Sequence, residues 1–306
     1  MNVKSVKIVF MGTPEFAVPS LEALAKEFGV ALVVTNPDKP AGRGLKLVPS
    51  PVKLKAMELG IPVLQSEKLK EPAFVNELKQ IEPDIIVVIA FKILPAEVFK
   101  VARVASFNVH PSLLPKYRGP APINWTIING ERETGLTTFV LQEEVDAGNI
   151  ILQWKYPIPE DFTAGDLHDF LAPKAGEIAV QTCRVLLSGN YQLFKQDDSL
   201  ATRAPKIYPE QCEIDWARGA VEIRNFIYGV SPTPGAWFIL DGKRFKIFRC
   251  KYKLEPHQNE PGKVIIQTNQ MLISCSDGFI IPTEVQFEGR KKMSIEGFLR
   301  GYRLAR

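Results

Sequence analysis

Two polar residues interrupt an apolar stretch in a way that could serve chemistry. Asn108 and His110 lie two positions apart at the end of the predicted strand 105–109. Side chains alternate along a strand, so the amide and the imidazole are expected on the same face. Together they could bind a carbonyl oxygen and move a proton. The alternative is a packed strand end with a hydrogen-bonded histidine, although only three histidines occur in the chain.

A carboxylate is needed to orient such a histidine and to stabilise its charged form. Asp146 is the best candidate, because the sequence Asp146–Gly148 predicts a tight turn between two strands. The alternative is an aspartate that only caps this turn. Spacing along the chain does not decide whether Asp146 reaches His110.

A mostly parallel sheet is expected to position these residues. Apolar strand-like runs alternate with amphipathic helices in the first half of the chain, which is typical of a Rossmann-like sheet covered on both faces. Ligands of such sheets bind at the carboxyl ends of the strands, where Asn108 and His110 lie. The predicted strands are 6–10, 31–35, 61–64, 85–90 and 105–109, and the predicted helices are 14–28, 50–59 and 72–80.

The first strand-to-helix turn argues against nucleotide cofactors. A dinucleotide-binding protein carries G-x-G-x-x-G in this turn, and the chain has only Gly12 there. Glu15 would also lie in the first helical turn and repel a phosphate. No P-loop sequence is present either, so the sequence argues against both NAD and ATP as ligands.

The later sequence predicts a second, smaller domain. Strands 136–141 and 150–156 and a helix from 163 to about 187 complete a catalytic domain over 1–189. A linker is expected over 190–207. An OB-like β-barrel is expected over 208–306, because short strands follow one another with hairpin turns between them. Residues 207–306 carry 15 basic and 11 acidic side chains, whereas 1–206 are neutral, which indicates an anionic partner for this part.

Composition sets broad limits on the kind of protein. Hydrophobic residues make up 45% of 306 residues, and no apolar run is long enough to span a bilayer. Without an apolar leader at Met1, we expect a soluble, cytoplasmic protein and a monomer. The four cysteines have no zinc-site spacing, so free thiols and no metal are expected.

At this point the residues resemble a known family. Asn108, His110, Ser112–Pro115 and Asp146–Gly148 are similar to the signature of the folate-dependent formyltransferases, whose substrates include glycinamide ribonucleotide, UDP-aminosugars and methionyl-tRNA. The resemblance implies 10-formyltetrahydrofolate as formyl donor and no metal. Its implied catalytic residues are Asn108, His110 and Asp146, and its implied cofactor-binding residues are Ser112, Leu113, Leu114, Pro115, Ala90, Phe91, Ile93 and Leu94. The segment 90–95 departs from the family, because it lacks the Tyr-Gly pair common there.

Three features resemble the family members that act on initiator methionyl-tRNA. These are the opening Gly12–Phe16, the segment 36–52, which is similar to an insertion loop entering the tRNA acceptor end, and the basic C-terminal domain. The resemblance implies initiator methionyl-tRNA as partner. Alternation along the strand 244–252 places Arg249 and Lys251 on one face of the sheet. It places Lys246 on the opposite face, together with Phe248 and Cys250. The predicted tRNA-binding residues are Lys39, Arg43, Lys46, Lys246, Arg249 and Lys251.

Two other interpretations remain open from the sequence. A formyltransferase acting on a UDP-aminosugar would share the same Asn, His and Asp residues and the same folate. A non-catalytic nucleic-acid-binding protein on a Rossmann-like scaffold would share the basic domain but would not need those residues. The basic domain and the loop Pro40–Gly44 favour tRNA over the aminosugar.

Overall fold

The computed structural model describes residues 6–41, 46–267 and 269–302. The chain forms two compact units, and each unit is assembled from three separate stretches of sequence. The first unit comprises Met1–Gly119, Thr134–Tyr156 and His168–Arg203, and the second comprises Pro120–Glu133, Pro157–Leu167 and Ala204–Arg306.

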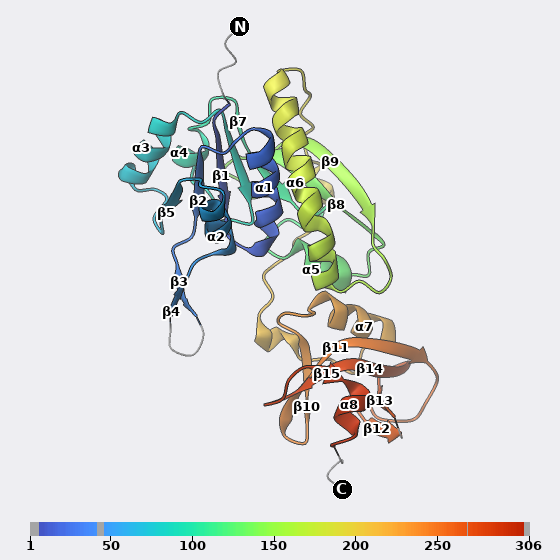
Figure 1. Ribbon diagram of the computed structural model, residues 1–306. Helices are drawn as coiled ribbons and strands as arrows, with labels where there is room; N and C mark the ends of the chain where they lie inside the picture. The colour runs from blue at the N-terminus through green and yellow to red at the C-terminus, as the bar shows by residue number, and fades with distance from the viewer. Residues whose placement is uncertain (1–5, 42–45, 268, 303–306) are drawn as a thin grey trace. The chain divides into compact units, whose positions relative to one another are not determined.

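A seven-stranded sheet forms the centre of the first unit, with the order β5-β2-β1-β6-β7-β8-β9 (Figure 1). The strands from β5 to β7 pair in parallel, and β8 pairs antiparallel with β7. The expectation of a mostly parallel α/β sheet is therefore confirmed. The strand bounds are β1 (Ile8–Gly12), β2 (Leu32–Thr35), β5 (Val63–Gln65), β6 (Ile85–Ile89), β7 (Ala105–His110), β8 (Glu133–Val140) and β9 (Ile150–Pro157).

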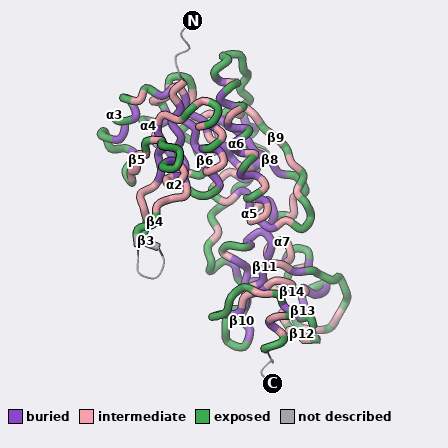
Figure 2. Tube along the Cα trace, in the orientation of Figure 1, coloured by how far each residue is buried: buried purple, intermediate pink, exposed green. Residues whose placement is uncertain are grey.

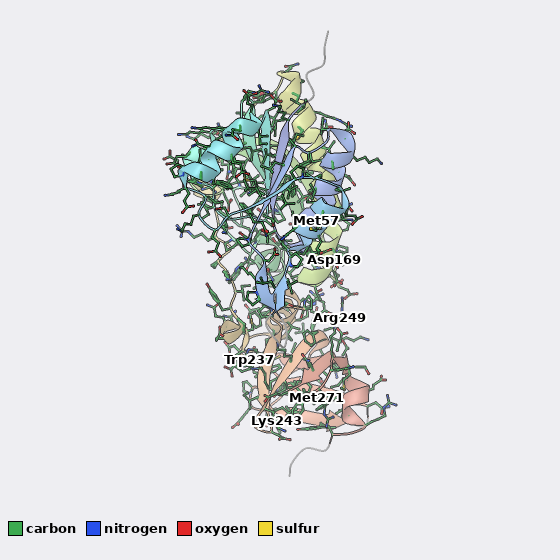
Figure 3. All side chains as sticks on the ribbon, turned by 60° about the vertical axis from the view of Figure 1, so that its left-hand side comes forward. Met57, Asp169, Trp237, Lys243, Arg249 and Met271 are labelled. Atoms are coloured by element: carbon green, nitrogen blue, oxygen red, sulfur yellow. The ribbon has the colours of Figure 1, made fainter. Side chains whose placement is uncertain are left out.

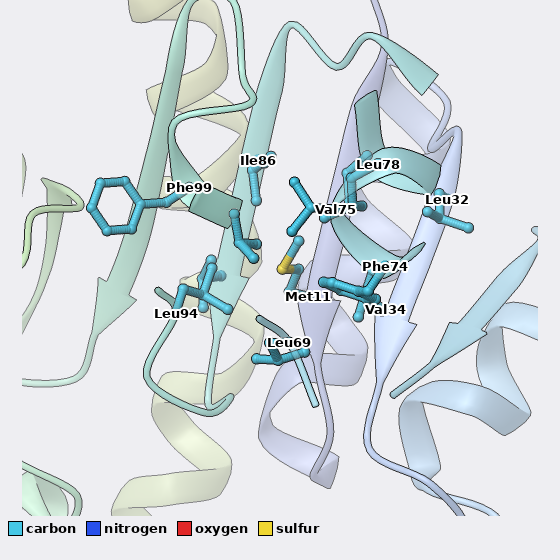
Figure 4. Packing of buried hydrophobic residues seen from close by; sticks show 13 residues of the cluster. Met11, Leu32, Val34, Leu69, Phe74, Val75, Leu78, Ile86, Leu94 and Phe99 are labelled. Carbon is cyan, nitrogen blue, oxygen red and sulfur yellow. The ribbon is translucent and has the colours of Figure 1, made fainter. Parts of the chain in front are cut away.

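Helices bury both faces of the central strands. Every residue of β1 and β6 is buried, as expected for parallel strands that are covered on both sides (Figure 2). On one face, Met11 and Ile86 pack against Phe74 and Leu78 of α3 (Figure 4). The helix bounds are α1 (Val18–Glu27), α2 (Pro51–Glu58), α3 (Pro72–Ile81), α4 (Ala96–Phe99) and α6 (Ala164–Ser188).

Local sequence signals explain where several elements begin. Ser50 caps α2, since its Oγ accepts a hydrogen bond from the Lys53 amide at 3.1 Å. Thr163 and Asp166 form the predicted capping box of α6, with the Asp166 amide donating to the Thr163 hydroxyl at 3.2 Å. The sequence did not predict the short α4, α5 (Pro122–Ile128) or the hairpin of β3 (Lys39–Ala41) and β4 (Lys46–Val48). These elements are too short to show a clear periodicity.

The second unit contains an antiparallel sheet with the order β10-β11-β14-β13-β12, and β15 pairs with β14. The expected antiparallel domain is thus confirmed, while its OB-like barrel character remains a prediction. Phe245, Phe287 and Phe298 meet in its core, with ring centroids 5.0–6.2 Å apart. The element bounds are β10 (Ala236–Leu240), β11 (Lys243–Leu254), β12 (Val264–Gln267), β13 (Gln270–Ser274), β14 (Gly278–Phe287), β15 (Met293–Ser294), α7 (Ala220–Gly229) and α8 (Ile295–Leu299).

Two further expectations concern the whole chain. All four cysteines are free and buried, which confirms the expected thiols. Burial raises the pKa of the Cys183 thiol to about 12, so this thiol is not a reactive thiolate near neutral pH. No helix within the described ranges is both long and apolar enough to cross a membrane.

Candidate active site

The regular register of β7 places Asn108 and His110 side by side. Asn108 lies between Val88 of β6 and Phe139 of β8, and His110 lies opposite Thr137. Two residues separated by one position in an unbroken strand project from the same face, as the sequence predicted. His110 is 5% exposed, whereas Asn108 is only partly buried. In the part of the chain that the structure describes, the Asn108 amide has no hydrogen-bond partner, so it remains able to bind a ligand.

The imidazole of His110 is held at one nitrogen and open at the other. Its Nε2 lies 2.8 Å from the carbonyl oxygen of Tyr117. A carbonyl oxygen can only accept a hydrogen bond, so Nε2 carries the hydrogen and donates it. In the neutral ring, Nδ1 is then the nitrogen without a proton. Nδ1 is therefore the atom of His110 that can exchange a proton.

The carboxylate of Asp146 faces this open nitrogen. Asp146 Oδ2 lies 4.0 Å from His110 Nδ1, and both side chains are almost fully buried, at 13% and 7% exposure. The same oxygen accepts a hydrogen bond from the Gly119 amide at 2.9 Å. The structure thus brings Asp146 next to His110, which the spacing in sequence could not decide. A separation of 4.0 Å exceeds a direct hydrogen bond but gives strong electrostatic contact in a buried site.

The first predicted cofactor-binding segment is the loop after β7, over residues 112–115. Ser112 is fully buried, and its Oγ donates to the Lys116 carbonyl at 2.7 Å. Leu114 is also buried, and its amide donates to Thr137 Oγ1 at 3.2 Å. Leu113 and Pro115 are partly exposed. Of the four residues predicted here to bind the cofactor, Leu113 and Pro115 therefore present the accessible surface.

The second predicted cofactor segment follows β6, the neighbour of β7. Ile93 is 72% exposed and Phe91 is partly exposed, whereas Leu94 is buried in the hydrophobic core beside α3. Ala90 is exposed and has a φ of 48°, in the left-handed region that favours glycine. An alanine in this conformation is strained, because its Cβ meets the backbone where a glycine would not.

Side chains of these two loops could hold a flat, polar-edged ligand such as a folate. A pterin is a flat ring with polar edges, so it requires apolar contact surface together with hydrogen-bonding groups. Ile93, Phe91 and Leu113 offer accessible apolar surface, and the Asn108 amide offers unused donors and an acceptor. Within the described ranges, no group of three histidine, cysteine or acidic side chains is placed to hold a metal ion.

The basic residues predicted to contact tRNA fall into different environments. Lys39 is exposed at the start of β3, whereas Arg43 lies outside the described residues, as does the side chain of Lys46. Lys251 is exposed, and Lys246 is partly buried with its Nζ donating to the Pro234 carbonyl at 2.7 Å.

The predicted alternation along β11 agrees with the burial of residues 248–251 but is wrong for Lys246, because a β-bulge interrupts the strand. The pairing with β14 shifts between Ile247 and Arg249, so Ile247 and Phe248 are both buried. Beyond the bulge Cys250 is buried, whereas Arg249 is partly exposed and Lys251 is fully exposed. An extra residue in one strand reverses the parity of every position after it. Lys246, Arg249 and Lys251 are therefore each less buried than their neighbours at 245, 247, 248 and 250, on both sides of the bulge.

Arg249 has a structural partner in its own unit (Figure 3 labels its side chain). Its Nη2 donates to both carboxylate oxygens of Asp166, at 2.8 and 2.6 Å. Burial alone would raise the pKa of the Asp166 carboxyl, but hydrogen bonds from Thr163 and the Arg249 guanidinium hold that pKa below its ordinary value. Arg249 thereby fixes the first turn of α6.

Comparison with known proteins identifies the class to which this fold belongs, which is that of the formyltransferases. Residues 6–183 match the formyl transferase family and residues 206–303 match the formyl transferase C-terminal domain, and the chain belongs to this family. It is 44% identical over 299 residues to the methionyl-tRNA formyltransferase of Clostridium novyi, covering 97% of each chain. It is 45% identical over 303 residues to that of Caldanaerobacter subterraneus, covering 98% of each chain.

Solved structures share the fold at lower identity. The N-formyltransferase from Helicobacter canadensis, in complex with folinic acid and dTDP-3-aminofucose, is 26% identical with a TM-score of 0.69, covering 90% of this chain and 98% of that one. A sugar 3N-formyl transferase is 24% identical with a TM-score of 0.68, covering 94% and 99%.

Sequence reasoning missed the backbone groups that complete the site. The Tyr117 carbonyl and the Gly119 amide hold His110 and Asp146, respectively. A backbone group leaves no mark of its own in a sequence. A usable signal was the run Arg118–Pro122, because two prolines and a glycine in the loop that follows a functional strand indicate a fixed backbone.

Proposed function

We propose that this chain transfers the formyl group of 10-formyltetrahydrofolate to the α-amino group of methionyl-initiator tRNA. The observation that carries the proposal is the 44% identity, over nearly the full length, to a methionyl-tRNA formyltransferase. The arrangement of Asn108, His110 and Asp146 supports it, because an amide, an imidazole and a carboxylate are the groups that this acyl transfer requires. The product would be N-formylmethionyl-tRNA, the form used to initiate translation.

In this proposal the folate supplies the formyl group, and Asn108, Leu113, Phe91 and Ile93 help to hold it. The Asn108 amide donates a hydrogen bond to the carbonyl oxygen, where negative charge develops as the amine attacks. Donors fixed in advance in a buried site stabilise that charge without having to reorganise.

His110 and Asp146 handle the proton of the attacking amine. His110 Nδ1 accepts that proton, directly or through a water, because Nε2 remains bonded to the Tyr117 carbonyl. The ring then becomes positively charged. The carboxylate of Asp146, 4.0 Å away, stabilises this charge, and the proton passes on to the leaving nitrogen.

We propose that tRNA contacts the exposed basic residues of both units. Lys39 and Lys251 are exposed, where phosphates can reach them, whereas Arg249 is already paired with Asp166. The contacts of Arg43 and Lys46 stay predictions from the sequence. A monomer is sufficient for this reaction, because Asn108, His110 and Asp146 all belong to one chain.

A second candidate substrate is a nucleotide-linked aminosugar. The N-formyltransferase from Helicobacter canadensis favours this candidate, since its structure holds dTDP-3-aminofucose and it covers 90% of this chain with a TM-score of 0.69. The higher identity to methionyl-tRNA formyltransferases favours the first proposal.

A substrate competition tests both candidates. The purified protein is incubated with 10-formyltetrahydrofolate and, separately, with methionyl-initiator tRNA, elongator methionyl-tRNA, a UDP-aminosugar and a dTDP-aminosugar. We expect formylation of the initiator tRNA at a kcat/KM at least about 100-fold above the others, a difference of roughly 2.7 kcal/mol in transition-state binding. Preferential formylation of an aminosugar would refute the tRNA assignment, and no formylation of any amine would refute the enzyme assignment.

A further inference from the structure

One buried side chain stands out in the segment that leads away from α6. Gln196 is 4% exposed, whereas residues 191–195 and 197–200 are all exposed. The segment reaches β9 at Phe194, whose amide donates to the Ile150 carbonyl at 2.9 Å. A polar side chain that is buried alone in an exposed stretch must have partners that account for its burial.

The amide of Gln196 uses its whole hydrogen-bonding capacity. Nε2 donates to the carbonyl oxygens of Asp146, at 2.9 Å, and Gly148, at 2.8 Å. Oε1 accepts from Arg118, from Nε at 3.1 Å and from Nη2 at 2.8 Å. Two donors and two lone pairs are thus all satisfied. Arg118 is itself fixed by Asp198, with a 2.6 Å contact.

The turn that Gln196 contacts is one that needs external support. Asp146 has a φ of 56°, and a left-handed conformation costs a residue with a side chain roughly 1–2 kcal/mol. Gly148 is buried, and a Cβ there would lie 1.8 Å from the Val140 carbonyl oxygen. The backbone of this turn is therefore both strained and closely packed, and the two bonds from Gln196 are made to the carbonyls at its two ends.

The same segment also holds the loop that contacts His110. Thr202 accepts a hydrogen bond from the Tyr117 amide at its Oγ1, at 2.9 Å, and from the Arg118 amide at its carbonyl, at 2.9 Å. That loop supplies the Tyr117 carbonyl to His110 and the Gly119 amide to Asp146. The Asp146 turn and the loop 117–119 are thus both hydrogen-bonded to residues 196–202.

We propose that Gln196 is a positioning residue, which fixes the Asp146 turn so that the Asp146 carboxylate faces His110 Nδ1. It acts through the backbone of the turn and touches no reacting atom. The inference deepens the proposed formyl transfer and rests on it for the kinetic readout.

The variant Gln196→Glu tests the two hydrogen bonds to the Asp146 turn separately from the contact with Arg118. A glutamate keeps the acceptor for Arg118 and the shape of the side chain, but it cannot donate to the Asp146 and Gly148 carbonyls. We expect kcat to fall about 10- to 100-fold, because displacing a catalytic group by about 1 Å has effects of this size, with KM changed by less than about threefold. Gln196→Met, which removes both sets of bonds, is expected to behave similarly. Gln192→Glu and Gln192→Met are matched controls, since Gln192 is exposed in the same segment.

A double-mutant cycle with Asp146→Ala shows whether Gln196 acts through Asp146. In that background Gln196→Glu should reduce kcat no further, since the carboxylate that it positions is gone. Wild-type kcat in Gln196→Glu, or an equal loss with and without Asp146, would overturn the proposal.

Hydrogen exchange gives a readout that does not depend on the reaction. The Gly119 amide is protected by Asp146 Oδ2, so its exchange should accelerate in Gln196→Glu and in Gln196→Met and stay unchanged in both Gln192 variants. Unchanged exchange at Gly119 in the Gln196 variants would refute the positioning role even if the substrate proved to be a different amine. If Gln196→Glu failed to fold, the same measurements on Arg118→Met, which removes the donors to Oε1, would test the proposal, with a smaller acceleration expected.

Discussion

The carboxyl end of β7 and the middle of β11 both carry polar side chains on a largely buried strand. The two regions differ in how far these side chains are buried and in which groups they contact. At the end of β7 the His110 side chain is buried, the Asp146 side chain beside it is 13% exposed, and each is held by a backbone group of the loop 115–119. Along β11, Lys251 is exposed, whereas Arg249 is tied to Asp166. Burial with fixed partners suits groups that must act on a single atom, and exposure suits groups that meet an extended polyanion.

The difference teaches which kind of substitution each region should tolerate. In the β7 region, loss of a side chain should lower turnover while leaving the binding of tRNA unchanged. In the β11 region, loss of a charge should alter binding or stability while leaving the chemical step unchanged. Three predictions test this contrast, and a fourth concerns the backbone of the loop after β6.

The largest effect is expected from His110→Ala and Asn108→Ala. Asn108→Ala removes an oxyanion donor and His110→Ala removes the proton acceptor, and each loss should lower kcat about 100- to 1000-fold. Single-turnover formylation measures the chemical step, and filter binding measures tRNA affinity, which should change little. Turnover like that of the wild type in either variant would contradict the assigned roles, and a parallel loss of tRNA affinity would erase the contrast between the regions.

A stability effect is expected from Arg249→Ala. The pair with Asp166 is about one third exposed, at 38% and 34%, so its loss should lower the free energy of unfolding by only about 1 kcal/mol. The folded-state pKa of Asp166 lies below its ordinary value, so this stabilisation is present at neutral pH and is lost as the pH falls through that lowered pKa. Thermal unfolding at pH 7 and near pH 3 measures the change, with Lys251→Ala as the exposed control. A difference in Tm that grows on acidification would contradict the pairing.

Lys251→Ala should act on binding alone. Among the residues that the structure describes, Lys251 has no ion-pair partner, so its loss should leave Tm unchanged. If it neutralises one phosphate, the slope of log Kd against log salt concentration should decrease by about 0.9. Binding titrations across a range of salt concentrations measure this slope, and an unchanged slope would remove Lys251 from the tRNA-binding surface.

The smallest effect is expected from Ala90→Gly. Ala90 has a φ of 48°, and glycine adopts this conformation without the penalty of a Cβ. The relief of about 1 kcal/mol is partly offset by the greater freedom of glycine in the unfolded chain, which leaves a net stabilisation of about 0.5 kcal/mol. Chemical denaturation detects a shift of this size. A lower free energy of unfolding would show that Ala90 is not strained.

The sequence predicted the catalytic side chains where the backbone is regular. Asn108 and His110 could be placed on one face because β7 has no bulge, and the apolar strands before it indicated the sheet. The same alternation failed along β11, because the extra residue at Phe248 changes the parity. Neither the bulge nor the ion pair between Arg249 and Asp166 has a local signal in the sequence.

The hydrogen bonds from Gln196 to the Asp146 turn could not be predicted from the sequence, for a different reason. Residues 190–207 show no periodicity and were interpreted as a linker, yet Gln196 lies against a turn 50 positions earlier in the chain. A long-range contact between a side chain and a backbone carbonyl depends on the folded path of both segments. The boundaries predicted for the two domains and the linker remain predictions, as does the monomeric state.

The interleaving of the two units has a practical consequence for anyone who wishes to study the catalytic half alone. Truncation after Arg203 would retain Gln196 and all three proposed catalytic residues, but it would also retain α5, which belongs to the other unit. There the Asn124 side chain donates to the Gly229 carbonyl at 2.7 Å and the Trp125 indole donates to the Pro205 carbonyl at 2.8 Å. A shortened chain would leave both donors without acceptors and uncover the apolar side of α5, so such fragments should associate or precipitate unless these residues are redesigned.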